Sequence, residues 1–171
     1  MDSAQNAEEA FLSAGIPSVE AKASSYGSTL LPDLAPLKQL GNSLVELAKS
    51  YQEAGDTTSA MQARQAAIRL GQNLGNPPQQ PVISTLVGLT IENITLATMD
   101  PNSPYDSSGQ TVGDRMKSIT QQRTDLKALN KQFEGLMGTL PDHGLIGFYD
   151  RQKALGPVPA MRWALDKYGP R

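Results

Sequence analysis

Apolar residues between positions 37 and 51 recur every three or four residues, and this spacing constrains the fold more than any other feature. Because an α-helix has 3.6 residues per turn, the spacing places these residues along one helix face. Gly55 is expected to end the helix, since glycine readily adopts the conformation that follows a last turn. Asp33 is expected to cap its start. The stripe consists of Leu37, Leu40, Leu44, Leu47, Ala48 and Tyr51.

A second helix is expected directly after the Gly55-Asp56 turn, over about residues 57–74. Small and apolar residues recur along one of its sides: Ala60, Ala63, Ala67, Leu70 and Leu74. Alanine at a helix crossing lets two backbones approach closely, while larger side chains fill the space around it. The sequence therefore predicts a helical hairpin built around small residues.

The other segments also predict helices, at residues 3–14, from 17, and at 82–99, 111–138, 144–155 and 159–168. Residues 82–99 are rich in β-branched side chains, yet a run of about 17 residues favours a buried helix, because strands usually end by about ten residues. Thr111 and Asp114 have the spacing of a capping box. Asp142 is expected to cap the helix from residue 144. We predict one all-α domain over residues 1–171, with about seven helices.

Composition excludes several classes of protein. The chain of 171 residues carries 15 Lys and Arg against 17 Asp and Glu, a balance that argues against nucleic-acid binding, which needs a strong positive field. It contains no cysteine, so disulfides, thiolate zinc sites and a cysteine nucleophile are excluded. No signal peptide and no run of 18 apolar residues is present, so we expect no membrane insertion within this chain. A cytoplasmic protein and a soluble domain of a longer exported or anchored protein both fit.

Residues 42–74 resemble one tetratricopeptide repeat, a pair of antiparallel helices with large and small residues at fixed offsets. The matching positions are Leu44, Leu47, Ala48 and Tyr51 in the first helix, Gly55-Asp56 in the turn, and Ala60 and Ala67 in the second helix. Two positions depart from the pattern: Arg64 replaces a bulky apolar residue, and Gln72 replaces the closing proline. The resemblance implies a right-handed array of stacked hairpins with a peptide-binding groove. By position, this groove would present Asn42, Val45, Lys49 and Gln52.

Candidate chemistry is sparse. The only histidine, His143, follows Asp142, but adjacent residues in a turn rarely align as a catalytic pair. The loop of residues 100–109 offers oxygen atoms that Ca²⁺ would accept, yet it lacks the glycine and the distal glutamate of an EF-hand, so Asx turns are predicted. Glu92 lies within the most apolar helix, where a carboxylate must be paired, protonated or facing a cleft.

Two sets of charged or aromatic residues are compatible with either a binding interface or a structural role. Arg123, Lys127 and Lys131 place three cations on one helix face, either for an acidic partner or simply toward solvent. Trp163 and Tyr149 lie among C-terminal cations such as Arg162, a mixture typical of binding hot spots and also of a small core.

These observations predict a non-catalytic interaction or scaffold module that binds a protein or peptide partner, without metal or cofactor. The alternative is a helical module that binds a small molecule or glycan. An enzyme that uses carboxylates such as Glu92 or Asp142 is the second alternative. The expected partner-binding residues are Asn42, Val45, Lys49, Gln52, Trp163 and Arg162.

Overall fold

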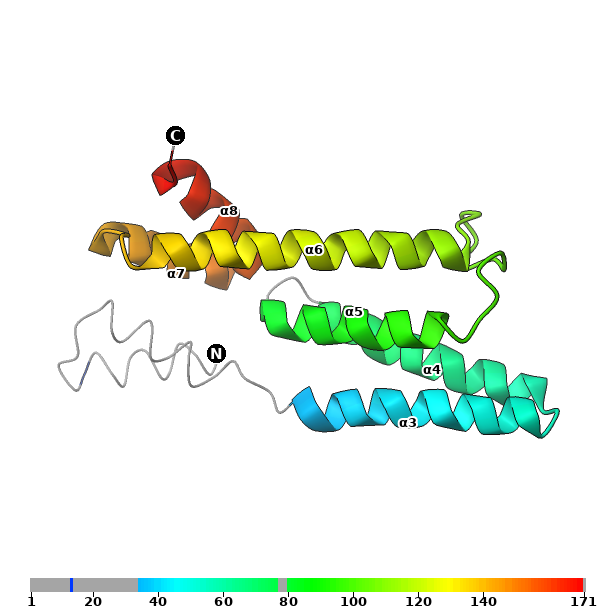
Figure 1. Cartoon of the computed structure of the whole chain (residues 1–171). Coiled ribbons are helices and arrows are strands. Elements are labelled where there is room, and N and C mark those ends of the chain that lie inside the picture. The colour runs from blue at the N-terminus through cyan, green and yellow to red at the C-terminus, as the bar shows by residue number, and fades with distance from the viewer. Residues whose placement is uncertain (1–12, 14–33, 77–79, 171) are drawn as a thin grey trace. The chain divides into compact units, whose positions relative to one another are not determined.

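The structure, a computed structural model, describes residues 13, 34–76 and 80–170. These residues form α-helices and no β-strand, which confirms the all-α prediction (Figure 1). The helices expected at 3–14 and from residue 17, and the Asp33 cap, lie outside the described residues apart from Ser13. The six helices are α3 (Leu34–Glu53), α4 (Thr57–Gly75), α5 (Val82–Leu96), α6 (Val112–Met137), α7 (Asp142–Leu155) and α8 (Pro157–Tyr168). None of them is both long and apolar enough to cross a membrane.

The chain divides into two compact units. The first, here called the hairpin unit, comprises Asp33–Pro77 and Val82–Leu126; it contains α3, α4, α5 and the first half of α6. The second, here called the C-terminal unit, includes Lys127–Arg171, with the end of α6, α7 and α8. Each unit has its own buried side chains.

The predicted turn between α3 and α4 is confirmed. Gly55 has a φ of 81°, a conformation that side chains disfavour, so glycine suits this position. Asp56 then caps α4, because its Oδ1 accepts a hydrogen bond of 2.9 Å from the Ser59 amide. Hydrogen bonds from Ser59 lower the pKa of Asp56; the side-chain bond has the larger effect and the backbone bond the smaller. Contacts between residues close together in the sequence are therefore sufficient to determine this turn.

Small residues bring α3, α4 and α5 unusually close together. A Cβ atom built on Gly88 of α5 would lie 2.2 Å from the carbonyl oxygen of Gly71 in α4, closer than two such atoms can approach. A Cβ on Gly41 of α3 would lie 2.7 Å from Ile91 in α5. Ala48 of α3 is also fully buried. The core of the hairpin unit thus depends on the absence of side chains at the crossings.

The apolar stripe of α3 lies mostly outside this core. Gly41, Val45 and Ala48 form the buried face of α3, whereas the neighbouring side chains of Leu40 and Leu47 remain 48% and 44% exposed. Our expectation that the large residues of the stripe fill the space around the small ones is wrong for these positions. The reason is that α4 and α5 approach over the small residues, one position further along the helix.

The loop after α5 ties α5 to the start of α6. The backbone amide of Gly113 donates to the carbonyl of Pro101 at 2.8 Å, and that of Tyr105 donates to Gln110 at 2.8 Å. Thr111 caps α6 as predicted, accepting a hydrogen bond from the Asp114 amide at 3.1 Å. The Asp114 carboxylate accepts from the Thr111 hydroxyl rather than from a free amide, which differs from a full capping box.

The C-terminal unit packs aromatic side chains between its helices. Phe133 of α6 and Phe148 of α7 have ring centroids 4.5 Å apart. Trp163 of α8 packs directly against Gly147, which has no side chain. A Cβ atom built on Gly147 would lie 2.8 Å from the indole. The residue that caps α7 is Pro141; Asp142 lies in the first turn, so its predicted role as a cap is wrong. Proline suits this end because its ring fixes φ there.

Candidate functional site

Glu92 is the most buried charged residue among the described side chains, at 1% exposure, and of the three alternatives that the sequence left open it is paired. Arg115, in the first turn of α6, binds it with both branches of its guanidinium: Nε donates to Oε1 at 2.7 Å and Nη2 donates to Oε2 at 2.8 Å. This bidentate geometry is the strong form of the ion pair. The hydrogen bond to Glu92 and its charge raise the pKa of Arg115 further, against the effect of burial.

Tyr105 adds a third contact to the same carboxylate. Its hydroxyl donates to Glu92 Oε1 at 2.6 Å and accepts from the side-chain amide of Gln72 at 2.8 Å. Burial and then the hydrogen bond to Glu92 raise the pKa of Tyr105. The cluster therefore joins α4, α5, the following loop and α6 around one buried carboxylate.

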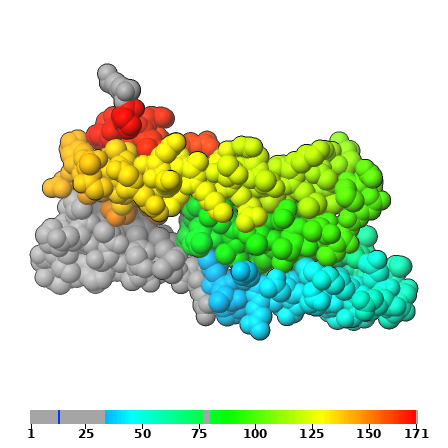
Figure 2. All heavy atoms as spheres, in the orientation of Figure 1, coloured from blue at the N-terminus to red at the C-terminus, as the bar shows by residue number. Residues whose placement is uncertain are grey.

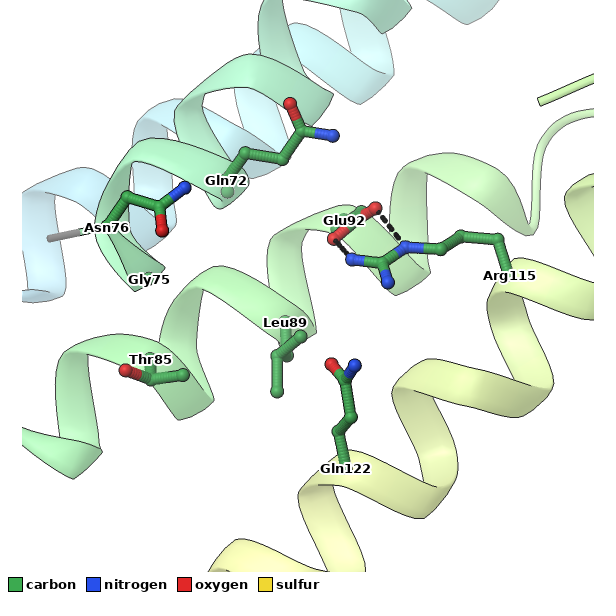
Figure 3. A pocket seen from close by; sticks show the side chains of 9 residues that line it. Gln72, Gly75, Asn76, Thr85, Leu89, Glu92, Arg115 and Gln122 are labelled. Carbon is green, nitrogen blue, oxygen red and sulfur yellow. Dashed lines mark hydrogen bonds and ion pairs between the residues drawn. The ribbon is translucent and has the colours of Figure 1, made fainter. Parts of the chain in front are cut away.

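A cavity of about 190 Å³ lies beside this cluster, within the hairpin unit (Figure 3). Its polar rim includes the side chains of Gln72, Asn76 and Gln122, which come from two different helices. The charged groups at its base, Glu92 and Arg115, are already bound to each other. The cavity can therefore offer amide groups to a small polar molecule, while its one carboxylate is occupied by structural contacts.

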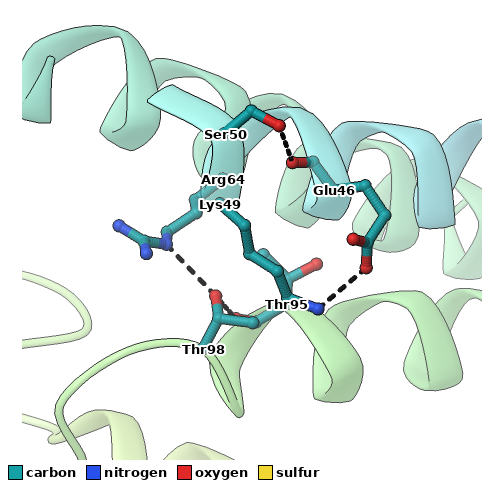
Figure 4. A network of polar contacts seen from close by, with 6 residues as sticks. All are labelled: Glu46, Lys49, Ser50, Arg64, Thr95 and Thr98. Carbon is teal, nitrogen blue, oxygen red and sulfur yellow. Dashed lines mark hydrogen bonds and ion pairs between the residues drawn. The ribbon is translucent and has the colours of Figure 1, made fainter. Parts of the chain in front are cut away.

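Arg64, the position that breaks the repeat pattern, is 9% exposed and contacts two neighbouring elements. Its Nε donates to the Thr98 hydroxyl, after the end of α5, at 3.1 Å, and its Nη2 donates to the side-chain oxygen of Gln52 in α3. Figure 4 shows the terminal nitrogens of Arg64 directed away from Thr98. A second cavity of about 270 Å³ opens here, and we call it the Arg64 pocket; its lining is Lys49, Gln52, Glu53, Arg64 and Thr98.

The exposed side of α3 is the third candidate site. Leu40, Leu47 and Tyr51 are 48%, 44% and 37% exposed, and Leu37 and Leu44 are half-buried on the same stripe. The spheres of α3, blue to cyan in Figure 2, lie at the surface along the length of the helix. We call these five side chains the α3 stripe.

The predicted groove residues do not all share one surface. Asn42, Lys49 and Gln52 are exposed, and the last two line the Arg64 pocket. Val45 is only 6% exposed, so the expectation that it lies on an open face is wrong. The cause is the packing of α3 against α4 and α5, which buries the line of Gly41, Val45 and Ala48.

The two predicted C-terminal residues differ in burial. Arg162 is exposed, while Trp163 is half-buried. The guanidinium carbon of Arg151 lies 3.8 Å from the Trp163 ring centroid, and Lys167 approaches the same ring at 5.3 Å. Such cation–π contacts hold the indole between α7 and α8. Trp163 thus serves the packing of this unit while part of it remains accessible.

The remaining candidates have local roles. His143 is exposed, and its ring lies 6.0 Å from that of Tyr168 in an edge-on contact. Asp100 and Asp106 accept hydrogen bonds from the amides of Asn102 and Ser108, at 2.9 and 2.8 Å, which confirms the predicted Asx turns. Across the described ranges, no group of three or more His, Asp or Glu side chains is placed to hold a metal ion.

Sequence reasoning identified Glu92 and Arg64 but missed their partners. The pairing of Glu92 with Arg115 joins residues 23 positions apart, and that of Arg64 with Thr98 joins residues 34 apart, so no local spacing signals either. One signal was present for the first pair: Arg115 lies in the first turn of α6, four residues after the predicted cap Thr111. Comparison of the chain with protein-family models, with curated proteins and with solved structures gave no match.

Proposed function

We propose that this protein is a non-catalytic interaction module, and that copies of it associate through the α3 stripe. The observation that carries this proposal is the exposure of large apolar side chains along one line of a helix whose other face is already packed. A contiguous apolar surface of this kind is typical of an interaction site. The packed cluster around Glu92 supports a structural rather than a catalytic role for this carboxylate, the most buried one among the described residues.

The spacing of the stripe supports a helix as the occupant. Leu37, Leu40, Leu44, Leu47 and Tyr51 are separated by three, four, three and four residues, the alternation of a coiled-coil seam. Such a seam accepts apolar side chains from a second helix, knobs into holes. Ser43 and Ser50 flank the stripe on the side away from the buried face of α3, and they place no charge beside the seam.

The charges of α3 are compatible with a second copy of the chain as the partner, because none of them lies beside the seam. Lys38 lies near the start of the helix and Glu53 at its end, and Glu46 already pairs with Lys49 at 2.8 Å. Lys38 and Glu53 lie on the side of α3 away from the seam, so they do not oppose each other or a like charge across it. Antiparallel pairing of two α3 helices aligns the two helix dipoles favourably. Identical chains therefore meet without repulsion between like charges.

The tetratricopeptide likeness belongs to the same proposal. The Gly55 turn and the buried Ala48, Ala60 and Ala67 support a repeat-like α3–α4 hairpin on which α5 stacks. Asn42, Lys49 and Gln52 on this hairpin, and Arg162 and Trp163 in the C-terminal unit, remain predicted contacts for a protein or peptide. The cavity beside Glu92 supports the alternative function, binding of a small polar molecule.

Sedimentation analysis of the purified protein tests the proposal. Over about 1 to 300 µM we expect a reversible monomer–dimer equilibrium. The variant Leu40→Glu/Leu47→Glu places unpaired charges in the seam and should weaken association at least about tenfold. The matched control is Leu155→Glu, which changes a leucine that is 54% exposed on α7 and should leave the equilibrium unchanged.

Three results would contradict the proposal. One is a monomer over the whole range, and another is an equal loss of association in Leu155→Glu. The third is association that Leu40→Glu/Leu47→Glu leaves intact, which would place the contact between copies elsewhere. Circular dichroism of each variant confirms that the helices remain formed.

A further inference from the structure

The Arg64 pocket contains a buried cation that forms no ion pair with any of the described residues. Arg64 is 9% exposed, and in the described part of the chain no carboxylate lies within ion-pair distance of it. Its two partners, Thr98 and Gln52, are uncharged. Taking a charge out of water without an opposite charge is costly, so such a position favours an anion.

The geometry of Arg64 leaves a binding fork open. A guanidinium has five N–H donors; Thr98 takes one and Gln52 another, which leaves three toward the pocket. Parallel N–H donors on one plane match the two oxygens of a carboxylate. The hydrogen bonds to Thr98 and Gln52 also fix the plane, so little side-chain entropy remains to be lost on binding.

The charges around the pocket favour a singly charged anion. Lys49 and Arg64 contribute two positive charges to the lining and Glu53 one negative charge. Lys49 is itself bound to Glu46 outside the lining. The lining residues by themselves therefore carry one net positive charge, which a carboxylate balances, whereas a doubly charged phosphate exceeds it beside Glu53.

We propose that the Arg64 pocket binds a carboxylate, held by the guanidinium of Arg64 with support from Lys49. The pocket volume of about 270 Å³ accommodates a small organic acid or the side chain of an acidic residue. The site is separate from the α3 stripe and does not depend on it. Free acids and acidic peptide side chains share this chemistry, and the experiment below separates them.

The test is a titration followed by the side-chain Nε–H signal of Arg64 in nuclear magnetic resonance spectra, at constant ionic strength. The probes are acetate, a blocked peptide with one aspartate, inorganic phosphate, and chloride as the salt control. We expect saturable shifts with acetate and with the peptide, and affinity for phosphate at least about threefold weaker. Tighter binding of the peptide than of acetate assigns the natural ligand to a protein chain, and the reverse assigns it to a free acid.

Variants distinguish bidentate binding by the Arg64 guanidinium from non-specific attraction between charges. Arg64→Met should lose at least about tenfold in acetate affinity, measured by the backbone amide signals of α4. Its matched control is Arg69→Met, an exposed arginine of the same helix, which should bind as the wild type does. Glu53→Gln removes the competing carboxylate and should tighten binding. Lys49→Met should weaken it severalfold, and this exposed position keeps the test valid if Arg64→Met fails to fold.

Some outcomes would overturn the inference. Shifts that do not saturate, or that chloride reproduces, would exclude a site. Equal loss in Arg64→Met and Arg69→Met, or phosphate binding as tight as acetate binding, would leave only non-specific charge attraction. Weaker acetate binding in Glu53→Gln would show that Glu53 supports the pocket in another way and would contradict the charge balance proposed here.

Discussion

Replacement of Gly88 by alanine tests the packing that holds the hairpin unit together. The new Cβ would lie 2.2 Å from the carbonyl oxygen of Gly71 and 3.0 Å from the Cβ of Leu74. Because an ordinary contact between carbon and oxygen is about 3.3 Å, α4 and α5 would have to separate by about 1 Å. Backbone atoms are on the other side of the contact, so no side-chain rotation relieves it.

The free energy of unfolding should fall by about 2 kcal/mol. Overpacking of this kind costs about 3 kcal/mol, and the better helix propensity of alanine returns about 1 kcal/mol. The midpoint of thermal unfolding should drop by about 4 to 8 °C. Urea unfolding followed by far-UV circular dichroism measures the first value, and a thermal scan measures the second.

Gly75→Ala is the matched control for Gly88→Ala. Gly75 ends α4, one turn after Gly71, and its new Cβ would lie an ordinary 3.8 Å from Thr85. We expect this variant to be neutral or to gain up to about 0.5 kcal/mol. If Gly88→Ala proves as stable as Gly75→Ala, the close crossing of α4 and α5 is refuted.

Three further predictions concern the buried cluster and the C-terminal unit. Arg115→Met leaves Glu92 buried without its ion pair and should lower the free energy of unfolding by about 3 kcal/mol, while addition of Glu92→Leu should restore most of it in urea unfolding. The pKa of Tyr105 is raised from its usual 10.0, so the stability linked to it is complete below that pH and is lost as pH rises through the folded value. Above pH of about 10, urea unfolding should therefore show a steeper loss of stability in the wild type than in Tyr105→Phe. Gly147→Ala places a Cβ 2.8 Å from the indole of Trp163, the only tryptophan, and should shift its fluorescence spectrum; an unchanged spectrum would contradict the stacking.

Local signals in the sequence were sufficient for most helices and turns. The Gly55-Asp56 turn and the cap at Thr111 depend on contacts within three or four residues, which a pattern can reveal. The apolar run from residue 82 was correctly assigned to a helix from its length, although the helix ends at Leu96 rather than at 99.

Contacts between distant residues limited the prediction of the sites. The apolar spacing from Leu37 to Tyr51 predicts a helix, but it does not reveal which side of that helix is buried. In the structure the buried side is the adjacent line of Gly41, Val45 and Ala48. The close approach of α5 to this line depends on Gly41, where a Cβ atom would lie 2.7 Å from Ile91. The sequence predicted that Glu92 is paired, protonated or facing a cleft, yet its pairing and its partners follow only from the folded chain.

A single-cysteine cross-link tests the proposed function most directly. The chain contains no cysteine, so Leu44→Cys introduces one thiol at the middle of the α3 stripe, where two copies meet in either helix direction. Leu155→Cys, at a leucine of α7 that is 54% exposed and so more accessible than the half-buried Leu44, is the control. Under mild oxidation we predict rapid formation of a disulfide-linked dimer from Leu44→Cys and much slower formation from Leu155→Cys. Equal rates in the two variants would contradict association through α3.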